Sequence, residues 1–216
     1  MKRLNVFALF ITTTLAALAA SQAAAQNLLA NPGFEDPIVP NAPNGVGLWS
    51  AFDGGGGPTS ANSAVSPRTG AQHLALGITG QNNNFAGVFQ DVTGVAPGQL
   101  FNFSVWHKSV GVFDIGAELR VEWRNPANSA EVSRTGNFVP TLTPDYVQFG
   151  IPQQVVPAGV GVARVVYAIQ SFGSGGTDNG TAFVDDAVAT KTPEPGTLSL
   201  AVLSLLSLAG VRRRSV

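Results

Sequence analysis

The sequence has no cysteine and only two histidines, and these absences exclude several kinds of site. Without a thiol there is no disulfide to stabilise the fold and no cysteine to act as nucleophile or metal ligand. His73 and His107 lie far apart in the sequence, so they give a weak basis for a zinc site or a histidine-dependent catalytic centre. We interpret both as ordinary residues at the surface or at its boundary.

Charged residues are also scarce, at 12% of the chain, and basic residues cluster only at its two ends. Residues 26–191 keep seven basic and twelve acidic side chains, which gives this part a net charge of about −5. A mildly acidic chain without basic clusters argues against nucleic acid as a partner. No stretch between the two ends shows the period of an amphipathic helix, so we expect no helix there.

The first 25 residues have the layout of a secretory signal peptide. Lys2 and Arg3 form a short basic region, residues 4–20 are apolar, and alanines at positions 23–25 supply the small side chains expected before a cleavage site. We therefore expect an exported protein whose mature chain starts near Gln26. An uncleaved N-terminal membrane anchor is the alternative interpretation.

The other end, residues 192–216, combines a polar break, an apolar run and a basic terminus. The break is Pro193-Glu194-Pro195, where the prolines prevent a helix or strand from continuing. The run 197–211 is 15 residues long and would form a helix of roughly 22 Å. This is shorter than the roughly 30 Å core of a bilayer, so the run can engage a membrane but makes a poor permanent anchor. Arg212-Arg213-Arg214 forms the basic terminus.

This tail resembles the PEP-CTERM sorting signal of Gram-negative bacteria. The resemblance implies processing by an exosortase, which is a membrane cysteine transpeptidase, and transient association with the inner membrane. It also implies a final place in the cell envelope or outside the cell, in a setting of exopolysaccharide and biofilm production. A C-terminal core helix is the competing interpretation, but such a helix would alternate polar and apolar faces, and this run does not.

Between the two signals, residues 26–191 form one domain of 166 residues, which is long enough for a hydrophobic core. Roughly ten short runs with strand character are separated by glycine and proline turns. The clearest alternation covers residues 100–108 and 115–123, and residues 160–169 read as a central strand. Residues 54–70 are expected to form a long mobile loop. The pattern predicts an all-β fold, a two-sheet antiparallel β-sandwich of the jelly-roll type.

Several short motifs follow one another in this domain. It opens on Asn-Leu-Leu-Ala-Asn-Pro-Gly-Phe-Glu at residues 27–35, and Trp49, Gln90, Pro97-Gly98 and Asp185-Asp186 follow in that order. The order resembles carbohydrate-binding modules of the galactose-binding-like jelly-roll type, in particular the CBM4/9 group. The resemblance implies the same sandwich and a non-catalytic, polysaccharide-binding role.

Three carboxylates, Glu35, Asp185 and Asp186, are expected to meet because the first and last strands of such a sandwich lie side by side. Without a basic neighbour they would repel one another, and a Ca²⁺ ion would relieve the repulsion. The resemblance implies a structural calcium ion held by Glu35 and Asp185. The competing interpretation is that these residues only cap strand ends. Which aspartate points inward depends on whether the strand contains a bulge there.

Sugars are bound by aromatic rings that stack on their C–H faces and by planar polar groups that reach their hydroxyls. Residues of these kinds on the polar sides of predicted strands are expected to line one concave sheet; they are Trp106, Asn102, Arg120, Glu118 and Gln90. Trp106 could equally be a partly exposed packing residue, whereas Trp49 and Trp123 are expected in the core.

No pair of residues stands out as catalytic. Glu118 and Glu122 share a strand face, but their backbones are about 13 Å apart, farther than the carboxylate pairs of glycosidases. Ser104 and His107 lie on opposite faces of one strand. We therefore expect a polysaccharide-binding protein that is not an enzyme. The alternatives are a structural or adhesive matrix protein with a broad exposed apolar patch, or a glycan-active hydrolase.

Overall fold

The computed structural model describes residues 26–172 and 178–192. Within these ranges the regular structure is entirely β. The strands are β1 (Val39–Pro40), β2 (Ser50–Asp53), β3 (Thr59–Ser63), β4 (His73–Thr79), β5 (Phe85–Thr93), β6 (Leu100–Phe113), β7 (Gly116–Arg124), β8 (Glu131–Arg134), β9 (Val147–Val155), β10 (Val162–Gln170) and β11 (Asn179–Thr192).

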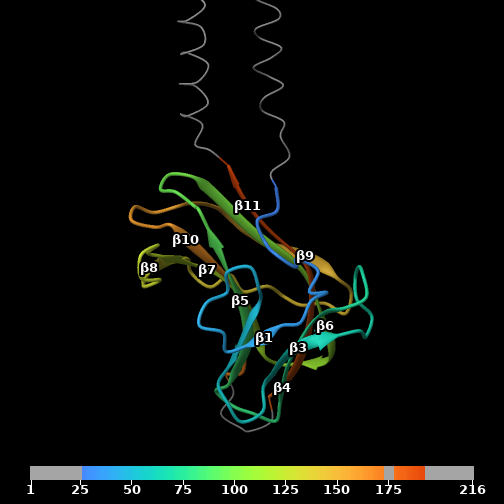
Figure 1. The fold of residues 1–216 in the computed structure, drawn as a ribbon. Helices are drawn as coiled ribbons and strands as arrows, with labels where there is room; N and C mark the ends of the chain where they lie inside the picture. The colour runs from blue at the N-terminus through green and yellow to red at the C-terminus, as the bar shows by residue number, and fades with distance from the viewer. Residues whose placement is uncertain (1–25, 173–177, 193–216) are drawn as a thin grey trace, which may run out of the picture. The chain divides into compact units, whose positions relative to one another are not determined.

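The strands form two sheets that pack face to face (Figure 1). One sheet has six strands in the order β1-β2-β5-β10-β7-β8, and the other has five in the order β3-β4-β11-β6-β9. All neighbouring strands are antiparallel except β1 and β2. The predicted antiparallel β-sandwich is confirmed, and β10 lies in the middle of the six-stranded sheet as its nearly continuous apolar sequence indicates.

The core lies between the sheets and follows from the alternation of side chains along each strand. On β7, for example, Leu119 and Val121 are buried in the core cluster, and Arg120 between them points to the opposite face. Trp49 and Trp123 are 1% and 3% exposed, so the prediction that both belong to the core is confirmed. The Trp49 indole also donates a hydrogen bond to the backbone oxygen of Asn31 at 2.9 Å.

Two predictions about individual segments are wrong. The expected loop at residues 54–70 contains β3, which pairs with β4. As an edge strand, β3 pairs with one neighbour only, so a polar sequence can form it. His73 and His107 are fully buried and not at the surface. Each lies on a long strand where neighbouring aromatic rings cover it: Phe183 contacts His73, and Phe149 stacks on His107.

The first residues of the compact unit Asn27–Thr192, residues 27–32, run beside β11 (Figure 1). The backbone nitrogen of Leu28 donates to the oxygen of Ala189 at 2.8 Å, and that of Ala187 donates to Pro32 at 2.9 Å. The expected signal peptide and sorting signal lie outside the described residues. Among the residues that are described, no helix has the length and apolar character needed to cross a membrane.

Candidate functional site

The three predicted carboxylates lie close to one turn, residues 66–72, and to a bulge in β11. The bulge begins after Asp185, and Asp186 there has a positive φ of 45°. Asp185 is fully buried and accepts backbone hydrogen bonds from Arg68 at 2.9 Å and Thr69 at 3.1 Å. Asp185 is thus the buried aspartate, but its pairing with Trp106 places it on the outer face of the five-stranded sheet, beneath the turn at residues 66–72, and not in the core.

Only two of these carboxylates remain without a cationic partner. Asp186 makes an ion pair with Arg68, so the premise that no basic residue lies nearby is wrong. Glu35 accepts hydrogen bonds from the backbone nitrogens of Ala71 and Gln72. Burial raises the pKa of Asp185, and the negative charge of Asp186 raises it further. Backbone hydrogen bonds to Asp185 act in the opposite direction but do not outweigh these two effects.

The fit of these residues to a calcium ion is therefore partial. A methyl group placed on Gly33 would lie 3.8 Å from oxygens of both Glu35 and Asp185, so the two carboxylates face one spot. Within residues 26–172 and 178–192 no group of three or more histidine or carboxylate side chains is arranged to hold a metal. A calcium ion here would have two carboxylate ligands and would depend on backbone oxygens for the rest.

The five predicted sugar-binding residues do not share one surface, which corrects the expectation of a single concave sheet. Trp106 and Asn102 belong to β6 in the five-stranded sheet, whereas Glu118 and Arg120 belong to β7 in the six-stranded sheet. Gln90 is only 1% exposed, and its amide exchanges two hydrogen bonds with the backbone of Ala30, so it fixes the N-terminal segment.

Trp106 is not an open platform. The Arg68 guanidinium lies 3.7 Å from the centre of its ring, and the ion pair with Asp186 holds Arg68 in place. Beside it, Lys108 lies 4.6 Å from the ring centre of Tyr146, whose hydroxyl is 2.7 Å from His73. The outer face of the five-stranded sheet is thus closed in this region by residues that already contact one another.

The outer face of the six-stranded sheet, which points away from the core, is organised differently. One side carries three phenylalanines of β2 and β5, with ring centres 6.0 Å apart for Phe52 and Phe85 and 6.3 Å apart for Phe52 and Phe89. Next to them lie the small residues Gly87 and Ala168, which are paired across β5 and β10. The Phe52 ring covers Gly87, and Ala168 is only 3% exposed, so the aromatic residues pack over these small residues.

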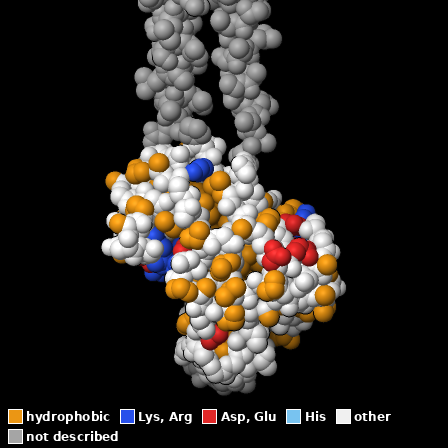
Figure 2. Space-filling model, viewed as in Figure 1, with side chains coloured by type: hydrophobic (Ala, Val, Ile, Leu, Met, Phe, Trp, Pro, Cys, Tyr) orange, Lys and Arg blue, Asp and Glu red, His pale blue; other side chains and the backbone are white. Residues whose placement is uncertain are grey.

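The other side of this face carries a ladder of alternating charges, which we call the charged ladder. It consists of Asp91 on β5, Arg164 on β10, the β7 residues Glu118, Arg120, Glu122 and Arg124, and Arg134 on β8. Directly paired positions across the strands carry opposite charges, as in Arg164 with Asp91 and with Glu122. Figure 2 shows basic and acidic side chains gathered together near the position of β7 and β8.

Two carboxylates of the ladder, Asp91 and Glu122, have lowered pKa values and so keep their charges. Burial alone would raise the pKa of Asp91, but the hydrogen bonds and charge of Arg164 outweigh it, so the pKa is lowered. The pKa of Glu122 is also lowered, because contacts with Arg124 and Arg120 outweigh its burial. A carboxylate whose pKa is lowered is a poor general acid, so Glu122, which is bonded to Arg120 and Arg124, is unsuited to be the acid of a hydrolase.

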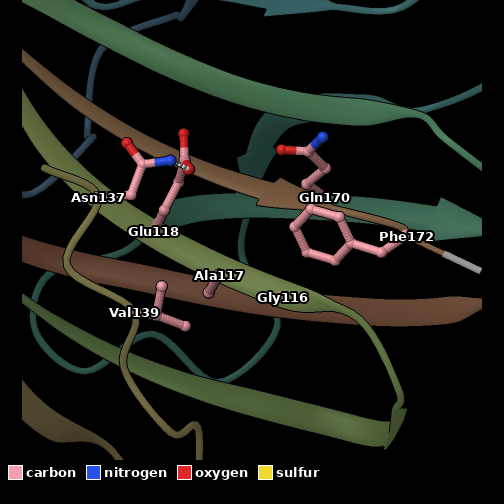
Figure 3. A pocket seen from close by; sticks show the side chains of 7 residues that line it. All are labelled: Gly116, Ala117, Glu118, Asn137, Val139, Gln170 and Phe172. Atoms are coloured by element: carbon pink, nitrogen blue, oxygen red, sulfur yellow. Dashed lines mark hydrogen bonds between the residues drawn. The ribbon is translucent and has the colours of Figure 1, made fainter.

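At one end of this face lies a shallow hollow of about 70 Å³, which we call the Phe172 hollow (Figure 3). Its lining residues are Gly116, Ala117, Glu118, Asn137, Val139, Gln170 and Phe172. The Phe172 ring covers Gly116 and is 67% exposed, and Asn137 donates a hydrogen bond to Glu118. The hollow is too small to enclose a ligand, so it offers an open aromatic and amide surface.

Sequence reasoning missed most of the Phe172 hollow. Only Glu118 was among the expected site residues, since Phe172 follows a strand and precedes a glycine-rich stretch, where an aromatic residue carries no periodic signal. Its one local clue is the nearby Gln170, a polar residue that ends a strand in which Arg164 is the only other polar side chain apart from the Tyr167 hydroxyl. The pairing of Gln170 with Phe85 and Gly116 depends on register between distant strands.

Comparison with known proteins places this fold among β-sandwiches that include carbohydrate-binding modules. The CBM22-1 xylan-binding domain of Xyn10C from Paenibacillus barcinonensis has a TM-score of 0.53 and 18% identity over 79% of this chain and 97% of that chain. TmCBM61, solved in complex with β-1,4-galactotriose, has a TM-score of 0.50 and 13% identity over 78% of this chain and 100% of that chain. At such low identity the likeness concerns the fold.

An enzyme is also among the similar structures. The enzymatically active domain of tailspike protein 4 from bacteriophage CBA120 has a TM-score of 0.57 and 15% identity over 77% of this chain. The match covers only 21% of the tailspike chain, so this chain corresponds to a small part of it. No family model matches the sequence, and no curated protein matches it either.

Proposed function

We propose that this protein is a non-catalytic polysaccharide-binding protein. The observation that carries the proposal is the Phe172 hollow, where an exposed aromatic ring lies beside the planar polar groups of Asn137, Gln170 and Glu118. Such a surface matches the amphipathic faces of a sugar, which stack on rings and exchange hydrogen bonds with amides. The xylan and β-1,4-galactotriose named for two structures of similar fold support the same class of ligand.

The sequence of the two ends supports the cellular side of the proposal. A cleaved N-terminal signal would export the chain, and a PEP-CTERM tail would make it a substrate of an exosortase. The protein would then act in the cell envelope or the extracellular matrix, where exopolysaccharide and biofilm material are its natural ligands. Detection of the tail-processed chain outside the inner membrane, and its absence when Pro193-Glu194-Pro195 is replaced by alanines, would test this sorting.

The binding proposal predicts that Phe172→Ala weakens retention on a polysaccharide by about 10- to 100-fold, since losing the contact of one large ring costs about 1.5–3 kcal/mol. The measurement is affinity electrophoresis through gels that contain xylan or β-1,4-galactan. The full-length chain is purified in a detergent without a sugar headgroup, which could otherwise compete for the site. Trp106→Ala is the matched control, because its ring is covered by Arg68 and lies on the other sheet.

The two variants separate the faces. Loss of retention in Phe172→Ala alone supports the six-stranded face, whereas loss in Trp106→Ala alone would move the site to the residues predicted from the sequence. If the wild-type chain is retained by no glycan, polysaccharide binding is wrong and the structural or adhesive matrix role takes its place.

We also propose a structural calcium ion between Glu35 and Asp185. The proposal rests on Asp185, a fully buried carboxylate bonded only to backbone nitrogens. Calcium at 100 times its dissociation constant should raise the melting temperature by about 5 °C or more, and EDTA should reverse the rise. Asp185→Asn should abolish this response while Asp186→Asn keeps it. An equal melting temperature in calcium and EDTA would rule the site out.

A further inference from the structure

We infer that the polysaccharide bound by the outer face of the six-stranded sheet is electrically neutral, and that the charged ladder excludes anionic glycans such as polyuronates. This inference rests on the proposed function and names its ligand class. The cations on this face are already paired with carboxylates of the protein itself.

Every arginine in the described part of the chain makes an ion pair with a carboxylate. The pairs are Arg68–Asp186, Arg120 with Glu118 and Glu122, Arg124–Glu122, Arg134–Glu131 and Arg164–Asp91. The two remaining cations of this part, Lys108 and Lys191, belong to β6 and β11 in the other sheet. The outer face of the six-stranded sheet therefore has basic side chains but no unpaired one.

The pairs on this face are also poorly hydrated, except Arg134–Glu131, whose side chains are 50% and 29% exposed. The side chains of Arg120, Arg124 and Arg164 are 16%, 17% and 13% exposed, and the carboxylates of Glu122 and Asp91 are 6% and 2% exposed. If Arg164 turned towards a sugar carboxylate, the buried Asp91 would be left without its counterion, which is strongly unfavourable. If Arg120 or Arg124 turned, the buried Glu122 would lose one of its two counterions. A sugar anion that approached without such a rearrangement would meet the ladder's own carboxylates and gain no free cation.

Neutral sugars avoid this penalty. The hydroxyls of a neutral chain need donors and acceptors, and the amides of Asn137 and Gln170 supply both next to the exposed ring of Phe172. Because binding of a neutral chain forms and breaks no ion pair, the affinity for it should hardly depend on salt concentration. The arrangement thus favours recognition by stacking and hydrogen bonding over recognition by charge.

The test measures retention of the full-length chain, in a detergent that contains no sugar, on xylan and β-1,4-galactan as neutral probes and on polygalacturonate as the anionic probe. Gels are run at about 20 mM and about 500 mM NaCl. We expect retention on a neutral glycan that is equal at both salt concentrations, and retention on polygalacturonate at least 100-fold weaker. Glu131→Lys is the positive control, because it frees Arg134, whose side chain is 50% exposed, and adds a second cation.

The outcomes separate this inference from the proposed function. Retention of the wild-type chain on polygalacturonate, weakened by salt, overturns the neutral-ligand inference and leaves polysaccharide binding in place. Retention on no glycan overturns the proposed function and this inference with it. Glu131→Lys should gain salt-sensitive retention on polygalacturonate; if it gains none, the pairing of the arginines is not what excludes anions, and the inference is wrong.

Discussion

Replacing Arg164 with alanine should lower the free energy of unfolding by about 3–5 kcal/mol, because it leaves a buried carboxylate without its counterion. The guanidinium of Arg164 bonds both oxygens of Asp91 at 2.6 and 2.8 Å, and the Asp91 side chain is only 2% exposed. Arg164 also covers the ring of Phe89, with its guanidinium carbon 3.8 Å from the ring centre. The substitution therefore removes an ion pair and a packing contact together.

Urea denaturation of the wild-type chain and the variant would measure this loss. Arg134→Ala is the matched control, since its ion pair with Glu131 is 50% and 29% exposed and should contribute no more than about 1 kcal/mol. Adding Asp91→Asn to Arg164→Ala should recover part of the lost stability by removing the unpaired charge. Equal effects of Arg164→Ala and Arg134→Ala would show that burial of the Asp91 pair does not strengthen it.

Acid should destabilise the folded chain between about pH 6.5 and pH 4, and His107 should contribute about 3 kcal/mol of the loss. His107 is fully buried between the sheets, and its Nδ1 lies 3.0 Å from the Tyr167 hydroxyl. Its Nε2 has no hydrogen-bond partner, so an added proton there would be an unsolvated charge. Burial accordingly lowers the pKa of His107 to about 4.

The sign follows from the two pKa values. The unfolded chain takes up a proton near pH 6.5, whereas folded His107 resists it down to about pH 4. The stability is thus fully present above pH 6.5 and is lost as the pH falls towards 4. His73, whose pKa is lowered to about 4 by burial and by the charge of Lys108, acts in the same direction.

The double variant His107→Phe with Tyr167→Phe tests this without leaving the tyrosine hydroxyl unpaired. The change in free energy of unfolding between pH 7 and pH 4, from urea titrations, should fall by about half, because His73 still contributes its share. The comparison uses the slope against pH, so a uniform change in stability does not affect it. A slope equal to that of the wild-type chain would contradict the role of His107.

The architecture of this protein was largely predictable from its sequence. Alternation over residues 100–108 and 115–123 places Leu119 and Val121 inside and their polar neighbours outside, because successive side chains of a strand point to opposite faces. The nearly continuous apolar run at 160–169, interrupted only by Arg164, likewise indicates a strand with neighbours on both sides. These are local properties of the backbone, so the two-sheet sandwich could be expected before any contact was known.

Only the tertiary structure decided how the site is assembled. Alternation puts Trp106 and Arg120 on the polar sides of their strands, but strand order assigns them to different sheets, and no local pattern encodes strand order. The burial of Asp185 depends on the distant residues Arg68 and Thr69, which cover it, and the bulge that follows it shifts the alternation by one residue, so that Ala187 returns to the core. Phe172 and Asn137 line the same hollow because β10 and β7 pair in a register that places Gln170 beside Gly116. This register is a property of the whole fold and not of any one segment.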